Sequence, residues 1–129
     1  MTKPIHQDVT ISASARQVYK ALTDAKTFSA VSGGAPTEIE ASPGGGFSLF
    51  GGQISGRNIE LVPGKRVVQA WRAGNWAEGV YSIARFELTE EAGKTTIAFD
   101  QAGFPDEARP HLEGGWAKMY WEPLKSHLS

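Results

Sequence analysis

The sequence contains no cysteine among its 129 residues. That absence excludes disulfide bonds, thiolate metal sites and a cysteine nucleophile together. The sequence also has no large excess of charge of either sign, because it contains 13 Lys and Arg and 14 Asp and Glu, for a net charge of −1. We therefore expect no electrostatic attraction to nucleic acid or to an anionic membrane surface.

Long apolar runs are also lacking. No stretch approaches the roughly 20 apolar residues that span a bilayer, and the opening MTKPIHQ has no signal-peptide core. We therefore expect a cytoplasmic protein without a membrane association. A chain of this size buries roughly two-thirds of its unfolded surface, which supports one domain over residues 1–129.

Patterns that would hold a metal or a phosphate are not found. His6, His111 and His127 are scattered, without the i, i+4 spacing of a helical metal site, so we expect neither a metal nor another cofactor. The glycine tract Pro43–Gly46 precedes a strand rather than a helix. It therefore predicts a turn and not a phosphate-binding loop.

The first part of the chain predicts a strand followed by two short helices. Ile5, Val9 and Ile11 occupy alternate positions, as in a half-buried strand. Ser12 or Ser14 can cap a helix, and Asp24 can cap a second one that ends at Gly33-Gly34.

The middle of the chain predicts antiparallel strands. Turn signals such as Pro63-Gly64 and Ala92-Gly93 separate short β-prone runs, and this spacing favours hairpins over parallel crossovers. The runs are 37–40, 47–50, 54–62, 66–72, 79–88 and 95–100. In the last of them Thr95, Ile97 and Phe99 should point inward.

After Pro105 the pattern becomes helical. The apolar stripe consists of Leu112, Trp116, Met119, Tyr120 and Leu124. Pro123 should kink the last turn. Because Tyr120 and Trp121 are neighbours on one helix, one of the two is expected to face solvent. The whole order predicts an α+β fold, a curved antiparallel sheet packed on a long C-terminal helix, with two short helices after the first strand.

Several segments resemble one known family. The block LFGGQISGRNIELVPGKRVVQAWRAGNWAEG at 49–79, the Gly-Phe-Pro at 103–105 and the run YWEPLK at 120–125 are similar to the C-terminal domain of the activator of heat-shock protein 90 ATPase. The resemblance implies the helix-grip fold of the START-like (SRPBCC) superfamily, shared with the birch-pollen allergen. Members of that superfamily mostly bind apolar small molecules. The eukaryotic co-chaperone has in addition an N-terminal clamp domain, for which this sequence has no room.

That fold predicts a cavity between the sheet and the last helix. The residues expected to line it are Trp71, Phe86, Ile97, Phe99, Leu112, Trp116 and Met119. A second set, Trp76, Tyr81 and Trp121, is expected at the cavity mouth or against a partner, because aromatic side chains dominate interface energies once buried.

The catalytic signal is weak. No Ser-His-Asp arrangement or carboxylate pair follows from the spacing, and Arg85 and Glu87 fall on the outer face of their strand. We therefore expect a binding domain rather than an enzyme, monomeric or homodimeric, that holds a small apolar or amphipathic molecule. The alternative is a stress-response co-chaperone that binds and stimulates a heat-shock protein 90 ATPase.

Overall fold

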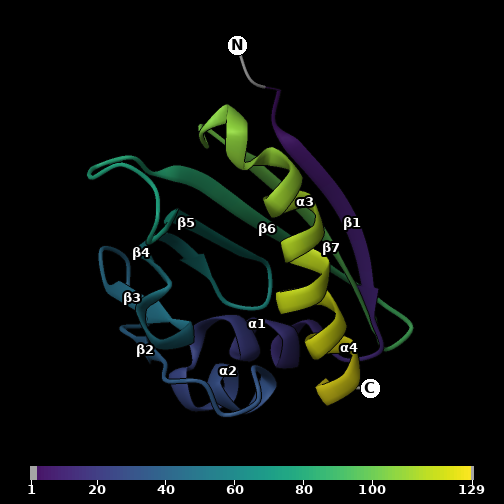
Figure 1. The fold of residues 1–129 in the computed structure, drawn as a ribbon. Helices are drawn as coiled ribbons and strands as arrows, with labels where there is room; N and C mark the ends of the chain where they lie inside the picture. The colour runs from purple at the N-terminus through teal and green to yellow at the C-terminus, as the bar shows by residue number, and fades with distance from the viewer. Residues whose placement is uncertain (1–2, 129) are drawn as a thin grey trace.

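A computed structural model describes residues 3–128. In it a curved antiparallel sheet of seven strands wraps around the C-terminal helix (Figure 1). The strands are β1 (Ile5–Ile11), β2 (Glu38–Ile39), β3 (Gly46–Leu49), β4 (Ile54–Val62), β5 (Arg66–Ala73), β6 (Ser82–Glu91) and β7 (Lys94–Ala102). Their order across the sheet is β1-β7-β6-β5-β4-β3-β2, so the predicted α+β helix-grip architecture is confirmed.

The strands fall in the predicted β-prone runs, with ends that differ by up to three residues. β6 begins at Ser82 and not at Gly79, because residues 74–81 leave the sheet as a loop. The predicted inward residues Thr95, Ile97 and Phe99 are all fully buried. The outward alternates Arg85 and Glu87 stand on the other face.

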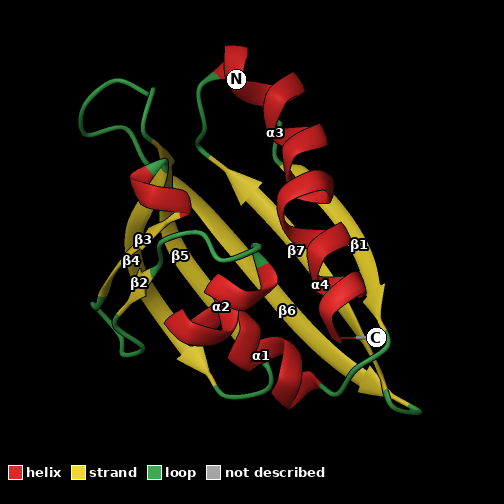
Figure 2. Cartoon of the chain, turned by 60° about the horizontal axis from the view of Figure 1, so that its bottom comes forward, coloured by secondary structure: helices red, strands yellow, loops and turns green. Residues whose placement is uncertain are grey.

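Two short helices, α1 (Ala15–Thr23) and α2 (Ala25–Val31), pack beside the C-terminal helix on the same side of the sheet (Figure 2). Ser14 rather than Ser12 caps α1, in a reciprocal capping box with Gln17. The Asp24 carboxylate accepts hydrogen bonds from the backbone N–H and the hydroxyl of Thr27, which caps α2 as predicted.

The C-terminal helix consists of a short 3-10 turn (η2, Asp106–Ala108), α3 (Arg109–Trp116), a π-helical segment (η3, Ala117–Trp121) and α4 (Glu122–Leu128). In the π-helical segment the N–H of Glu122 donates to the carbonyl of Ala117, five residues back. The extra residue in this turn changes which side chains face the sheet.

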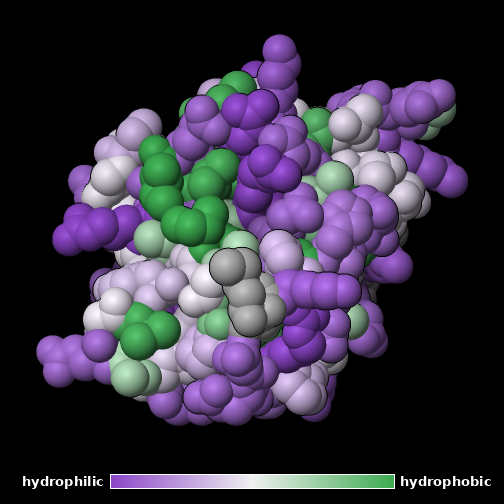
Figure 3. Space-filling view, turned by 90° about the horizontal axis from the view of Figure 1, so that it is seen from above, coloured by the Kyte–Doolittle hydropathy of each residue, from purple (hydrophilic) through white to green (hydrophobic). Residues whose placement is uncertain are grey.

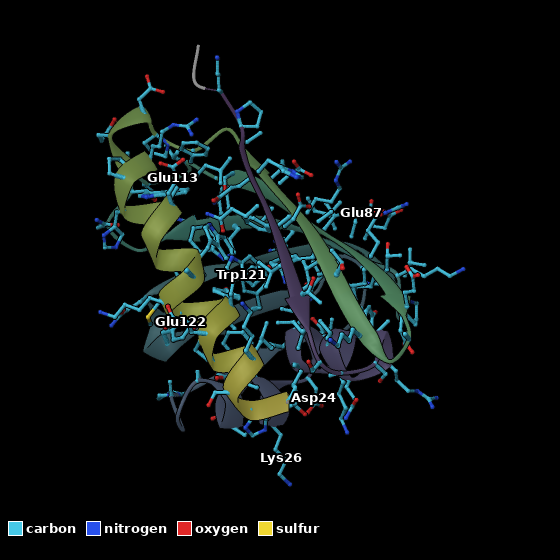
Figure 4. The ribbon with its side chains drawn as sticks, turned by 90° about the vertical axis from the view of Figure 1, so that its right-hand side faces the viewer. Asp24, Lys26, Glu87, Glu113, Trp121 and Glu122 are labelled. Carbon is cyan, nitrogen blue, oxygen red and sulfur yellow. The ribbon has the colours of Figure 1, made fainter. Side chains whose placement is uncertain are left out.

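The expectation that Tyr120 or Trp121 faces solvent is therefore wrong. Both side chains are only 4% exposed, because the wider π turn brings two successive residues onto the inner face. Met119, which the α-helical stripe placed inside, is instead 40% exposed. Figure 4 shows Trp121 between the helix and the sheet, with Glu122 on the helix and Glu87 on the far side of the sheet.

The core under the helix is tightly filled. The ring of Trp116 lies 4.2 Å from that of Phe99, which lies 5.0 Å from Phe86. Trp121 also donates an indole N–H hydrogen bond of 2.7 Å to the Gln7 side chain on β1. Within residues 3–128, no helix has the length and apolar character needed to cross a membrane.

Candidate functional site

A pocket of about 1230 Å³ opens between the loop after β5, the start of the C-terminal helix and a short 3-10 turn, η1 (Phe50–Gly52). Figure 3 looks from above at the side of the molecule that carries this loop and the beginning of α3, where hydrophobic atoms gather among hydrophilic ones. The principal lining side chains are Phe50, Ile54, Trp71, Trp76, Val80, Phe104, His111, Leu112, Trp116, Lys118, Met119 and Tyr120. The volume exceeds the range of about 300–1,000 Å³ common for small-molecule sites, so the pocket is open and groove-like.

Three aromatic side chains form its inner wall. Trp71 comes from β5, while Trp116 and Tyr120 come from the C-terminal helix. The Trp71 and Trp116 rings are 5.1 Å apart, and those of Trp116 and Tyr120 are 4.4 Å apart. Such a wall offers flat apolar surface to a ligand.

Polar atoms in this wall form a buried hydrogen-bonded chain. The indole N–H of Trp116 donates to Gln101 Oε1 at 2.8 Å, and Gln101 Nε2 donates to Ser82 Oγ at 3.0 Å. Ser82 Oγ in turn donates to the carbonyl of Trp71 at 2.8 Å. The chain satisfies side chains that would otherwise be costly to bury, and it ties the helix to the sheet behind the pocket.

Tyr120 makes a separate contact. Its hydroxyl oxygen accepts the indole N–H of Trp71 at 3.3 Å. Burial raises the pKa of the Tyr120 phenol far above its ordinary value, because the low-dielectric surroundings disfavour the phenolate. The phenol is therefore neutral throughout the physiological pH range.

The turn η1 supplies the opposite wall with a strained backbone. Phe50 has φ +52°, in the left-handed region that non-glycine residues rarely adopt, and Gly51 follows at +67°. The Phe50 ring contacts the rings of Phe28 and Tyr120 at 5.5 and 6.0 Å. Packing of this ring on both neighbours offsets the backbone strain.

Arg72 fixes the loop that carries Trp76. Its Nη2 donates to the carbonyl of Trp76 at 2.7 Å, and its guanidinium lies over the ring of Tyr81, 5.7 Å from the centroid. Trp76 then packs edge-on against Trp71 at 5.7 Å. The loop is thereby held over the edge of the pocket from the outer side of the sheet.

The structure brings together four of the seven residues expected to line a cavity: Trp71, Leu112, Trp116 and Met119. Phe86, Ile97 and Phe99 do not border the pocket, because the helix packs directly on them and fills that space. Within the second set Trp76 lines the pocket, whereas Tyr81 is 47% exposed at the end of the loop before β6. Trp121 is buried and reaches neither a cavity mouth nor the surface.

Sequence reasoning left several lining residues unassigned. Phe50 and Phe104 stand beside glycines, at Gly51-Gly52 and Gly103, and these pairs could have marked loop aromatics at a site. Tyr120 was assigned to the helix stripe, without a role in a site. Among residues 3–128, no three His, Asp or Glu side chains cluster as a metal site would require.

The chain matches known proteins along most of its length. The family model of the Activator of Hsp90 ATPase homolog 1-like proteins matches residues 12–129. The mouse activator of 90 kDa heat shock protein ATPase homolog 2 is 32% identical over 93 residues, which is 72% of this chain and 28% of the mouse protein. The human homolog 1 is 29% identical over 116 residues, 90% of this chain and 34% of the human protein. The chain thus spans about a third of these relatives.

Solved structures have the same fold. An HSP90 activator from Plasmodium falciparum superposes with a TM-score of 0.92 at 22% identity, covering 98% of this chain and 96% of that one. The Aha1 dimer from Colwellia psychrerythraea superposes with a TM-score of 0.81 at 22% identity, covering 98% and 96%. The solved structures show the START-like fold, and the match of the family model shows that the chain belongs to the Activator of Hsp90 ATPase homolog 1-like family.

Proposed function

We propose that this chain is a co-chaperone-like domain that binds a heat-shock protein 90 chaperone and alters its ATP turnover. The match of the family model over residues 12–129 carries the proposal. The names of the mouse and human relatives, which are activators of that ATPase, support it. Because those relatives are about three times longer, the proposal concerns the contribution that one START-like domain makes.

The outer face of β6 is the surface that best fits such a partner. Ile83 on this face and Tyr81, the loop residue just before β6, are each 47% exposed, and Arg72 lies against Tyr81. Tyrosine and arginine are enriched in protein interfaces, and large apolar side chains contribute most when a partner covers them. Trp121, which the sequence suggested for this role, is replaced by Ile83.

The test uses the purified chaperone, its steady-state ATPase and the affinity of the chain for it. We expect saturable binding and a changed ATP turnover at excess chain. The double variant Tyr81→Ser/Ile83→Ser should weaken binding about 10- to 100-fold, which corresponds to roughly 1–3 kcal/mol for an interface anchor. Lys26→Ala, on exposed α2 at the lower end of the molecule in Figure 4, is the control and should bind like the wild type. The absence of binding by the wild type at high excess would refute the proposal.

A second candidate function has its own support. The aromatic-walled pocket between the β5–β6 loop and the C-terminal helix suits a small apolar or amphipathic molecule. Native mass spectrometry of freshly purified protein, beside the same sample denatured, is the direct measurement. A mass increment that is lost on denaturation would support a bound ligand, and a bare protein mass would argue against one. The same spectrum distinguishes monomer from homodimer.

We propose binding without catalysis. The ionisable side chains that line the pocket are Glu107, His111, Lys118 and Tyr120, and the first three are exposed at the rim. Tyr120 is the one that reaches the inner wall, and its raised pKa keeps the phenol protonated, so that it does not accept a proton as a general base. A hydrolase or cyclase activity that is higher in the wild type than in the Tyr120→Phe variant would contradict this assignment.

A further inference from the structure

The Tyr120 hydroxyl has an unused hydrogen. The side chain is 4% exposed, and its oxygen accepts the indole N–H of Trp71. Among residues 3–128 this is the only hydrogen bond that the hydroxyl makes, so its own O–H has no acceptor there. A buried donor without an acceptor is costly, and buried hydroxyl groups in folded proteins are normally paired.

Neighbouring polar groups in the inner wall are already satisfied. The Trp116 indole donates to Gln101, and the Gln101 amide and the Ser82 hydroxyl continue that chain to the backbone of Trp71. The Trp71 indole donates to Tyr120 itself. The phenol O–H is therefore a side-chain donor that this wall leaves for a molecule in the pocket.

The surroundings of this donor favour an uncharged acceptor. The other ionisable side chains of the pocket, Lys118, His111 and Glu107, are exposed at its rim. A carboxylate placed against the inner wall would lose its water without gaining a cation. A ketone or amide oxygen loses much less hydration and accepts one hydrogen bond well.

We propose that Tyr120 donates its hydroxyl hydrogen to the carbonyl oxygen of a neutral, ring-containing apolar molecule held in this pocket. The rings of Trp71, Trp116 and Phe50 would enclose the body of that molecule, and any charge it carries would lie at the rim. This inference rests on the small-molecule function proposed above. It adds the chemical class of the ligand and the group that orients it.

Two probes of the same shape test the inference. 2-Acetylnaphthalene carries the carbonyl oxygen, and 2-isopropenylnaphthalene has a CH₂ group in its place. Affinities are measured by NMR titration of the ¹⁵N-labelled full chain, following the indole N–H signals of Trp71 and Trp76. We expect the ketone to bind about five- to tenfold more tightly, the value of one net hydrogen bond.

The variant Tyr120→Phe keeps the ring and removes the hydroxyl. It should bind both probes equally, with the affinity that the wild type has for the hydrocarbon. Tyr19→Phe on α1, a tyrosine that does not line this pocket, should keep the wild-type preference for the ketone. If Tyr120→Phe fails to fold, the ratio of the wild-type affinities for the ketone and the hydrocarbon is the test of the inference.

The outcomes separate the two proposals. Equal affinity of the wild type for both probes would refute the donor role of Tyr120. A preference for the ketone that persists in Tyr120→Phe would refute it too. Either result would leave the proposed pocket function unaffected. Failure of both probes to bind at their solubility limits would overturn the pocket function and this inference with it. A tighter complex with 2-naphthoate than with the ketone would refute the neutral ligand class.

Discussion

Gly56 lies where the sheet leaves no space for a side chain. A Cβ atom there would stand 1.8 Å from the backbone oxygen of Ala70 on the paired strand, so backbone would have to move. We expect Gly56→Ala to lower the free energy of unfolding by about 2–4 kcal/mol. Gly114 on α3 is the control, since a Cβ there meets nothing within 4 Å. Gly114→Ala should raise stability by up to about 1 kcal/mol.

Urea denaturation of the wild type and both alanine variants provides the comparison. Equal effects of the two substitutions would mean that the close approach of Gly56 to Ala70 does not constrain the sheet. The sequence alone could not tell the two glycines apart. Both stand in predicted elements, and only the pairing of Gly56 with Trp71 across β4 and β5 makes one of them indispensable.

His6 on β1 titrates next to two carboxylates. Its Nδ1 lies 2.7 Å from Asp100 Oδ1 and its Nε2 lies 3.0 Å from Asp8 Oδ2. These hydrogen bonds, first that of Asp100, raise the His6 pKa above its ordinary 6.5. Protonated His6 therefore contributes stability below about pH 6.5, and the contribution is lost as the pH rises through the folded-state pKa.

An NMR titration of the His6 ring measures this directly. We expect a midpoint above that of an unfolded histidine, and Asp100→Asn should lower it more than Asp8→Asn does. Arg85 also binds Asp100, at 3.2 Å. A His6 midpoint at or below the ordinary value would contradict the ion pair.

The π-helical segment behaves as a one-residue insertion in the C-terminal helix. With about 100° per residue in an α-helix, removal of one residue from this turn leaves Leu112, Trp116, Trp121 and Leu124 on one face. We therefore expect the protein to tolerate deletion of exposed Lys118, with a free energy of unfolding within about 2 kcal/mol of the wild-type value. Insertion of an alanine at the same place should rotate Trp121 and Leu124 away from the sheet and cost more than about 4 kcal/mol.

Chemical denaturation of the two length variants, with near-UV circular dichroism for tryptophan packing, compares them. Equal loss of stability in both variants would mean that the π turn is needed to hold Tyr120, which forms part of the pocket wall, as well as Trp121 on the inner face.

Strands and most helix ends could be predicted from the sequence because they follow from local signals. Alternating apolar residues predict β1 and β7, and Asp24 predicts the start of α2. The π turn could not be predicted, since the stripe at 112, 116, 120 and 124 fits an α-helix equally well. The pocket was only partly predictable, because Phe50 owes its position to a left-handed φ and to contacts with residues distant in sequence.

The two proposed sites lie on opposite faces of the same sheet. The pocket opens on the side covered by the C-terminal helix, whereas Ile83 stands on the outer face of β6 and Tyr81 lies just before it in the loop. A small molecule and a chaperone can therefore bind at once. We expect saturating 2-acetylnaphthalene to change the Kd for the chaperone by less than about threefold, a weak coupling. Strong competition would place the chaperone contact in the pocket.

Arg72 is the physical link between these faces, because one guanidinium contacts Tyr81 on the outside and the backbone of Trp76 at the pocket. We expect Arg72→Ala to lower the affinity for both the naphthyl ketone probe and the chaperone by roughly three- to tenfold. The variant loses the hydrogen bond to the loop and the support for Tyr81. Tyr81→Ser should lower the affinity for the chaperone and leave the affinity for the probe unchanged. The two affinities, measured on the same samples by NMR titration and by calorimetry, distinguish a shared support from two separate sites. An Arg72→Ala variant with both affinities unchanged would show that the loop keeps its position without this side chain.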